Sequence, residues 1–271
     1  LFHSCYINYN EPETGKATLR VLSRNQCSIR SPKQNCCGMP AMEAGDMALA
    51  TKLAEGNVEA LLPYVKKGYR VAALNPTCAL TLRKEYPRLL DTKEAHLVSE
   101  AVVDPHEILF DLKKRKVFDR SFKSTPGKVG YHVPCHLQAM SRGFRSRDLI
   151  RLIPGTKIEL VENCCGHDGT WAMKKEFFEM SLEVGKKAFD GMASTEADTL
   201  ATDCPLAAIQ FQQAMDTRPM HPMVILDRAY QEDGFPTKVE ESASDSSSIP
   251  MPKGLPPLAH TLNSGVPDEE T

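Results

Sequence analysis

The chain has 271 residues, of which 41% are hydrophobic, and its formal net charge is −2. This composition is sufficient for a buried core, and without a basic tract it gives no reason to expect nucleic-acid binding. No apolar run approaches the roughly eighteen residues of a membrane span, and residues 1–10 lack the regions of a signal peptide. We therefore expect no transmembrane segment and a cytoplasmic protein, either free or peripheral on the cytoplasmic face of a membrane.

Short strands and amphipathic helices alternate along the chain. Apolar residues at helical spacing predict one helix through residues 50–65 and another through residues 173–188. Strands are predicted at Lys157–Val161 and just before three of the cysteines, namely Cys78, Cys135 and Cys204. Such alternation favours parallel sheets covered by helices, in which functional groups gather at the carboxyl ends of the strands.

Eight of the nine cysteines follow one pattern that occurs twice. In each copy, 28 to 30 residues separate a first cysteine from a Cys-Cys-Gly triplet, and 38 to 40 residues separate that cysteine pair from a last cysteine. The first copy contains Cys5, Cys36, Cys37 and Cys78, and the second contains Cys135, Cys164, Cys165 and Cys204. Corresponding cysteines lie 126 to 130 residues apart, which indicates a duplication.

We expect an α/β fold of two tandem homologous Rossmann-like cysteine-rich repeats, with short parallel sheets covered by helices. The first repeat is predicted over residues 1–120 and the second over residues 128–231, with a linker between Phe118 and Lys128. From residue 232 the chain becomes rich in Ser and Pro, and it has no aromatic residue after Phe235. Such a segment buries too little apolar surface to offset its ordering entropy, so residues 232–271 are predicted to be a disordered tail.

The cysteine pattern favours a metal centre in each copy. Clustered cysteines in a chain without an export signal indicate reduced thiols, and iron–sulfur clusters are commonly held by four of them. Gly38 and Gly166 would let the backbone approach a cluster closely. Cys78 and Cys204 are predicted at the starts of helices, where a thiol ionises more readily. Zinc is the competing metal, although its usual Cys-x-x-Cys hooks do not occur here, and a non-catalytic scaffold stabilised by metal is a further alternative.

Several other residues near the motifs have less specific interpretations. Cys27 lies outside the pattern, and packing is the simplest role for it. His132, His136 and His167 flank the cysteines, where each is a candidate to ligate metal, tune its potential or relay protons. The plain alternative for each histidine is a hydrogen bond to the backbone near the site. Trp171 is interpreted as a core residue.

With these motifs, residues 2–230 resemble the duplicated cysteine-rich CCG domain family. Its members include the B subunit of heterodisulfide reductase, the iron–sulfur subunit of glycolate oxidase and the C subunit of anaerobic glycerol-3-phosphate dehydrogenase. The resemblance is carried by Cys5–Asn10, Cys36–Gly38, Thr77–Cys78, Leu82–Pro87, Tyr131–His136, Cys164–Gly166 and Thr202–Cys204. The ferredoxin-like part that precedes the repeats in such proteins is not in this sequence, as expected of a chain that begins within a longer protein or of a stand-alone version.

The resemblance implies an iron–sulfur electron-transfer subunit of an oxidoreductase, with one [4Fe–4S] cluster per repeat held by the eight cysteines. Electrons would pass from a flavin-dependent dehydrogenase of the glycerol-3-phosphate or glycolate type towards quinone, a membrane-linked acceptor or another acceptor. Substrate chemistry would take place on the partner chain, because this sequence has no Gly-x-Gly-x-x-Gly motif for FAD or NAD and no catalytic residue is expected in it.

One departure from the heterodisulfide reductases bears on the chemistry. Each repeat of those members ends in Cys-x-x-Cys, whereas Thr81 and Ala207 occupy the second positions here. Neither side chain can supply a thiolate. This favours clusters that pass electrons over a cluster-based thiol–disulfide reductase, which remains the alternative.

Overall fold

The structure is a computed structural model that describes residues 1–239. Its first half contains α1 (Cys5–Tyr9), α2 (Pro12–Arg24), α3 (Met39–Glu43), α4 (Met47–Lys66), β1 (Val71–Ala72), α5 (Pro76–Leu80), the π-helix η1 (Thr81–Glu85), α6 (Tyr86–Leu90), α7 (Lys93–Ala101), β2 (Val102–Val103) and α8 (Pro105–Lys114). Its second half contains β3 (Ser124–Thr125), β4 (Lys128–His132), α9 (Cys135–Ala139), α10 (Arg145–Ile150), β5 (Lys157–Val161), the 3₁₀ helix η2 (Trp171–Met173), α11 (Phe178–Ser194), β6 (Thr199–Thr202), α12 (Pro205–Met215), α13 (Pro222–Ala229) and β7 (Thr237–Lys238). None of the helices in this range is both long and apolar enough to cross a bilayer.

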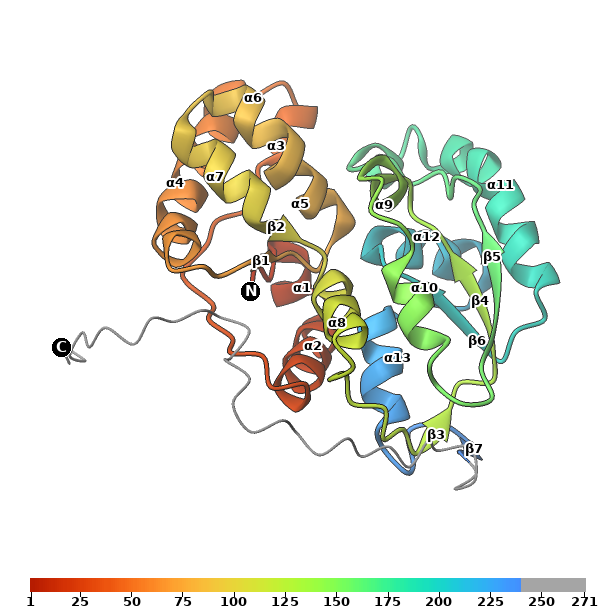
Figure 1. The fold of residues 1–271 in the computed structure, drawn as a ribbon. Coiled ribbons are helices and arrows are strands. Elements are labelled where there is room, and N and C mark those ends of the chain that lie inside the picture. The colour runs from red at the N-terminus through yellow and green to blue at the C-terminus, as the bar shows by residue number, and fades with distance from the viewer. Residues whose placement is uncertain (240–271) are drawn as a thin grey trace.

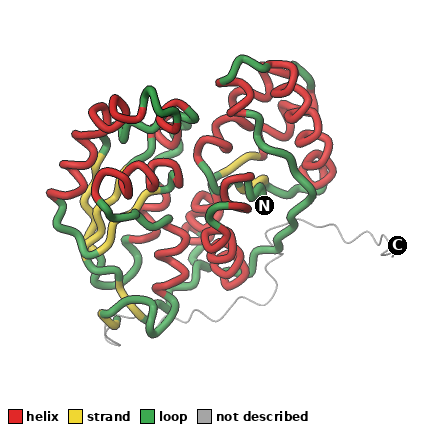
Figure 2. The backbone as a smooth tube through the Cα atoms, turned by 180° about the vertical axis from the view of Figure 1, so that it is seen from behind, coloured by secondary structure: helices red, strands yellow, loops and turns green. Residues whose placement is uncertain are grey.

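Each half has a short parallel sheet (Figures 1 and 2). In the first, β1 pairs with β2, and a single bridge joins Phe2 to Ala73. In the second, the strand order is β5-β4-β6, and a bridge from Ala201 to Met220 extends the edge of β6. The four strands predicted from the sequence are therefore confirmed, as is the α/β class with short parallel sheets.

Helices cover both faces of the second sheet. Alternate residues of a strand point to opposite faces, so Val129 and Tyr131 of β4 face one apolar core and Leu200 of β6 faces another. α10 and α13 contribute to the first of these cores, and α11 and α12 to the second. This covered parallel arrangement brings the carboxyl ends of β4, β5 and β6 to one edge, where the cysteines of the second copy follow.

A shared core lies between the two halves, where α2 packs on α13 and α8 packs on α10 (Figure 1). Its buried residues on these helices are Val21, Leu22, Leu109, Leu112, Leu149, Ile150, Met223, Ile225, Leu226 and Ala229. Phe118 and Phe122 are buried in the same core. The segment predicted as a linker is thus part of the core, because the chain crosses between the halves where their helices meet.

The start of the predicted disordered tail is wrong for residues 232–239. β7 pairs antiparallel with β3, and Phe235 is buried in the shared core. The N–H of Phe235 donates to Ser124 Oγ at 3.1 Å, and the Arg228 guanidinium lies 4.7 Å from the centre of its ring. One aromatic anchor therefore orders a segment whose composition alone predicts disorder. The rest of that predicted tail, residues 240–271, lies outside the described residues.

Replacing Phe235 with alanine should lower the free energy of unfolding by about 3 kcal/mol, because a buried aromatic ring is lost from a packed core. Urea denaturation followed by circular dichroism measures the change. Met180→Ala is the control, since that side chain is 58% exposed and should change stability by less than about 0.5 kcal/mol. Equal effects of the two substitutions would contradict the anchoring role.

The helix predicted through residues 173–188 is present in part as α11, which begins only at Phe178, and most of its predicted apolar stripe does not form the core. Met180 and Val184 are more than half exposed, whereas Ser181, Gly185 and Ala188 are buried. Around Ser181 and Gly185 the helix turns small residues inward because the chain around the second Cys-Cys-Gly triplet passes directly beneath it, whereas Phe189 and Met192 further along are buried in the core. The first predicted helix behaves as expected, since α4 buries Ala50, Ala54, Val58 and Leu61.

Candidate metal centres

The four cysteines of the first copy come together in the first half. Cys5 begins α1, Cys36 and Cys37 precede α3, and Cys78 lies in α5. The sulfurs of Cys5 and Cys36 are 3.8 Å apart, and the Cys37 thiol contacts both Cys36 and Cys78. Cys37 and Cys78 are buried while Cys5 is exposed, so the group lies at the edge of the core with one side open.

Local capping places these cysteines. Ser4 has a left-handed backbone with φ 57°, and its hydroxyl accepts the N–H of Ile7 in the first turn of α1. Gly38 has φ 92° and forms the N-cap of α3, directly after the cysteine pair. The side chain of Asn75 caps α5 by accepting the N–H of Thr77 at 3.0 Å, which sets Cys78 in the first turn.

Asn57 and Tyr86 brace the first Cys-Cys pair, and neither was identified from the sequence. The Asn57 amide donates to the Cys36 carbonyl at 3.0 Å and accepts the N–H of Asn35 at 2.8 Å. The Tyr86 hydroxyl accepts from the Asn57 amide at 2.9 Å and donates to the Cys37 carbonyl at 3.1 Å. Both side chains are buried. The only signal in the sequence is an asparagine on the apolar stripe of a predicted helix.

Asn57→Ala should lower the free energy of unfolding by about 1–3 kcal/mol, because it removes the hydrogen bonds of a buried amide to Asn35, Cys36 and Tyr86. Chemical denaturation measures this loss. Glu59→Ala, at an exposed position of the same helix, is the control and should be near neutral. An Asn57→Ala protein as stable as the control would show that these hydrogen bonds do not contribute to stability.

The thiols of the first group share their protons. Hydrogen bonds from Cys37 and Cys5 lower the pKa of Cys36 to about 2. The same hydrogen bonds to the Cys36 thiolate raise the pKa values of Cys5 and Cys37, and burial adds to both shifts. Cys36 is therefore the most acidic of these three thiols, and a metal would take the place of the protons that remain on the sulfurs.

The second group has the same layout in the second half. Cys135 begins α9, Cys164 and Cys165 follow β5, and Cys204 is the N-cap of α12. Burial, with smaller contributions from the charges of Cys204, Cys164 and Cys135, raises the pKa of Cys165 to about 12. Such charge effects weaken with distance, so they indicate that the other three sulfurs lie near Cys165.

The predicted easier ionisation of Cys204 is wrong. Cys204 does lie at a helix start, and the backbone N–H groups of Leu206 and Ala207 lower its pKa. Burial outweighs them and raises the pKa of Cys204 to about 12. In the metal-free protein this cysteine is a thiol.

Two glycines let the second Cys-Cys turn pack against α11. Gly166 has φ 78°, and a Cβ on it would overlap the carbonyl oxygen of Ser181. A Cβ on Gly185 would in turn overlap the carbonyl oxygen of Cys165. The turn and the helix are therefore in backbone contact, which explains why α11 has small residues at Ser181 and Gly185.

The three flanking histidines have different surroundings. His132 is buried, donates from Nε2 to the Asn163 carbonyl and contacts Thr202 Oγ1 with Nδ1, each at 3.1 Å. Its two nitrogens are thus used within the fold, and burial lowers its pKa to about 4. His136 is hydrogen-bonded to Thr77 at 2.7 Å. His167 Nδ1 is buried with no partner among residues 1–239.

The two cysteine groups are neighbours. α9 of the second half packs on α5 of the first, and the hydrogen bond between Thr77 and His136 joins the residues adjacent to Cys78 and Cys135. On the other side, Tyr6 follows Cys5. Burial raises the pKa of Tyr6, and Cys204 is close enough for a negative charge on its sulfur to raise it as well. Each group therefore borders a residue next to the first cysteine of the other.

The spacing of the sulfurs tests which metal they suit. Four sulfurs bound to one zinc ion at about 2.3 Å lie about 3.8 Å apart in a tetrahedron. Cys5 and Cys36 meet that spacing, but in neither group do three sulfurs of the described chain lie within 4.8 Å of one another. This spacing favours a cluster of several irons over a single zinc ion.

The two positions where the heterodisulfide reductases have a fifth cysteine are occupied here by buried side chains. Thr81 is buried, and its hydroxyl donates to the Thr77 carbonyl at 2.9 Å. Ala207 is also buried.

Cys27 belongs to neither cysteine group. Its side chain packs beside the shared core, and burial raises its pKa to about 11. It behaves as the packing residue that the sequence indicated.

Two half-buried groups of four cysteines, each following the strands of a small α/β unit, define a duplicated cysteine-rich protein. The chain belongs to the CCG cysteine-rich domain family, whose model matches residues 1–83 and again residues 129–212. The family expected from the motifs is thereby confirmed.

Three relatives illustrate the range of this family. The chain is 33% identical over 231 residues to the C subunit of anaerobic glycerol-3-phosphate dehydrogenase from Escherichia coli (strain K12), covering 84% of this chain and 58% of that protein. It is 29% identical over 244 residues to the B subunit of fumarate reductase (CoM/CoB) from Methanothermobacter marburgensis, covering 86% and 46%. It is 29% identical over 216 residues to lactate utilization protein A of Bacillus cereus (strain B4264), covering 75% and 86%. The chain spans about half the length of the first two relatives.

Proposed function

We propose that this protein is an iron–sulfur electron-transfer subunit of an oxidoreductase. Cys5, Cys36, Cys37 and Cys78 would hold one cluster, and Cys135, Cys164, Cys165 and Cys204 would hold a second, each of the [4Fe–4S] type. The observation that carries the proposal is the assembly of four thiols in each half, with the two groups adjoining across the hydrogen bond between Thr77 and His136.

The adjoining position of the groups supports a relay. A bound cluster supplies one-electron chemistry, and two such centres side by side suit the passage of electrons through the chain. The protein's own contribution is to hold the thiols and to set their surroundings. Cys37, Cys78 and Cys165 are buried, which limits water, while Cys5, Cys135 and Cys164 are exposed and leave one side of each group open to a partner.

The partner and the acceptor are part of the proposal. Two relatives are named as subunits of a dehydrogenase and a reductase, and the chain covers only part of each. By analogy the electron donor would be a flavin-dependent dehydrogenase subunit, and the acceptor would be quinone or another carrier. The substrate would be oxidised on the partner, and the site would be cytoplasmic or on the cytoplasmic face of a membrane.

The alternative of a thiol–disulfide reductase has less support. That chemistry in the family is associated with a fifth cysteine per repeat, and Thr81 and Ala207 fill those positions with buried side chains that cannot ligate iron.

Metal analysis of anaerobically purified full-length protein tests the proposal. We expect a brown protein that contains acid-labile sulfide. It should take up two electrons per chain in a titration with reduced methyl viologen and then show the EPR signals of reduced clusters. A colourless protein with zinc in the cysteine groups and no acid-labile sulfide would refute it.

A further inference from the structure

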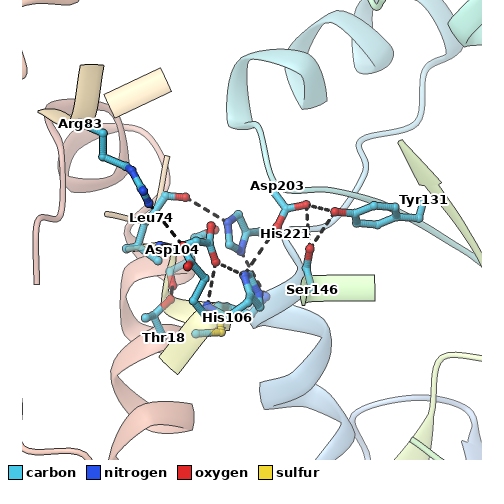
Figure 3. A network of polar contacts seen from close by, with 12 residues as sticks. Thr18, Leu74, Arg83, Asp104, His106, Tyr131, Ser146, Asp203 and His221 are labelled. Carbon is cyan, nitrogen blue, oxygen red and sulfur yellow. Dashed lines mark hydrogen bonds and ion pairs between the residues drawn. The ribbon is translucent and has the colours of Figure 1, made fainter. Parts of the chain in front are cut away.

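A second kind of ligand cluster lies where the two halves meet (Figure 3). It consists of Asp104, His106 and Asp203, with exposed fractions of 4%, 1% and 0%. Asp104 is the N-cap of α8, and His106 lies in the first turn of that helix. Asp203 follows β6 in the second half. The proposed electron-transfer function uses none of these side chains.

One atom of each side chain lies within 4.8 Å of the other two. His106 Nδ1 is 2.6 Å from Asp104 Oδ1 and 3.6 Å from Asp203 Oδ1. Among the residues that the structure describes, this is the single group of three such side chains with that spacing. Two carboxylates and one imidazole are a common ligand set for divalent cations.

The surrounding hydrogen bonds orient these groups and leave three atoms free. Asp203 Oδ2 accepts from the hydroxyls of Tyr131 and Ser146 (Figure 3). Asp104 Oδ1 accepts the backbone N–H of His106 at 2.7 Å. Within the described chain, Asp104 Oδ2, His106 Nε2 and Asp203 Oδ1 are buried without a hydrogen-bond partner. Buried polar atoms in a native fold are nearly always satisfied, so these three indicate a bound group.

The residues around the cluster supply no further cationic partner for its two carboxyl groups. His221 stacks on His106 with ring centres 5.8 Å apart, but its Nε2 donates to the Leu74 carbonyl and its Nδ1 accepts the N–H of Met223. Burial lowers the pKa of His221 to about 3, so this ring is neutral. The nearby Arg83 faces Glu107 at 3.8 Å. Two buried carboxylates therefore have only the imidazole of His106 to offset them.

A proton on His106 offsets the charge of one carboxylate only. A divalent cation with a neutral imidazole would balance both carboxylates and engage the free oxygens, Asp104 Oδ2 and Asp203 Oδ1. Tyr131 and Ser146 would then act as the outer contacts that hold a ligating carboxylate in place.

We propose that Asp104, His106 and Asp203 bind one zinc ion at the junction of the two halves. The ion would be separate from the eight cysteines, with nitrogen and oxygen ligands only. Because two ligands come from α8 and its cap and the third follows β6, the ion would link the first half to the second and stabilise the folded state over the unfolded one.

The test uses the full chain, purified anaerobically after growth with added zinc, and analysed for zinc, iron and acid-labile sulfide. X-ray absorption at the zinc edge then gives the atoms around the ion. We expect one zinc per chain with nitrogen and oxygen neighbours at about 2.0 Å. No zinc in the wild-type protein, or zinc with sulfur neighbours at about 2.3 Å, would overturn the proposal.

Variants locate the ion. Asp104→Asn and His106→Gln should each lose at least 90% of the zinc while iron and sulfide stay at the wild-type level. Asp111→Asn removes a carboxylate from the same helix at an exposed position and should keep the zinc. Retention of zinc by Asp104→Asn and His106→Gln would refute the site. If neither variant folds, the zinc-edge spectrum of the wild-type protein decides alone.

Discussion

Cys37→Ser is expected to leave the protein with about half its iron, lost from the first group, and with the second group intact. Cys37 is 3% exposed and contacts the sulfurs of both Cys36 and Cys78, so it is central to its group. A serine hydroxyl is much harder to ionise than a thiol and is a poorer ligand for iron. Iron and sulfide analysis with EPR measures the remaining cluster.

Cys165→Ser should give the reciprocal result, with the first cluster kept and the second lost. Cys27→Ser is the matched control, because it makes the same change outside both groups and should keep all the iron. The adjoining position of the groups makes a single cluster shared between the halves the competing arrangement. Loss of nearly all iron from both Cys37→Ser and Cys165→Ser, with normal circular dichroism, would establish that arrangement instead.

Gly166→Ala should destabilise the protein by about 4 kcal/mol, whereas the equivalent Gly38→Ala should cost about 1 kcal/mol. Both glycines have positive φ, which an alanine adopts at a cost of about 1–2 kcal/mol. The difference between the two variants arises from the room available for an added Cβ. A Cβ on Gly166 would overlap the Ser181 carbonyl, while one on Gly38 would lie 3.4 Å from the Ala50 carbonyl. Displacing backbone in a packed region costs about 1–3 kcal/mol more.

Urea denaturation of the two glycine variants measures this difference directly. Gly166→Ala should also lower the iron content of the second group, because the turn that carries Cys164 and Cys165 would move away from α11. Similar stabilities of the two variants would show that α11 can shift without loss, and the close packing at Gly166 would then not matter.

The strands and the cysteine groups could be predicted because local sequence determines both. A strand such as Lys157–Val161 shows its apolar alternation directly, and a duplicated spacing places Cys36 and Cys164 in equivalent turns. The sequence could not show which side of α11 is buried. That depends on how closely the backbone at Gly166 approaches the helix, and the approach is a contact between residues distant in sequence.

The remaining features depend on contacts across the molecule. Phe235 orders residues 232–239 only because a pocket between Ser124 and Arg228 receives it. Asp104 and Asp203 are 99 positions apart in the chain, and no motif in the sequence pairs them, although Asp203 precedes Cys204. Composition and periodicity describe a segment by itself, so they miss residues whose role is set by a partner from the other half.

Because α2 packs on α13 and α8 packs on α10, each half covers apolar surface of the other. A fragment ending after α8 would expose the apolar side chains of Leu22, Leu109 and Leu112 to water. Such a fragment should associate with a second copy of itself or aggregate. The duplication has in this way turned what would be an interface between two separate chains into the interior of one chain, so the two cysteine groups are always present in equal number and in a fixed relation.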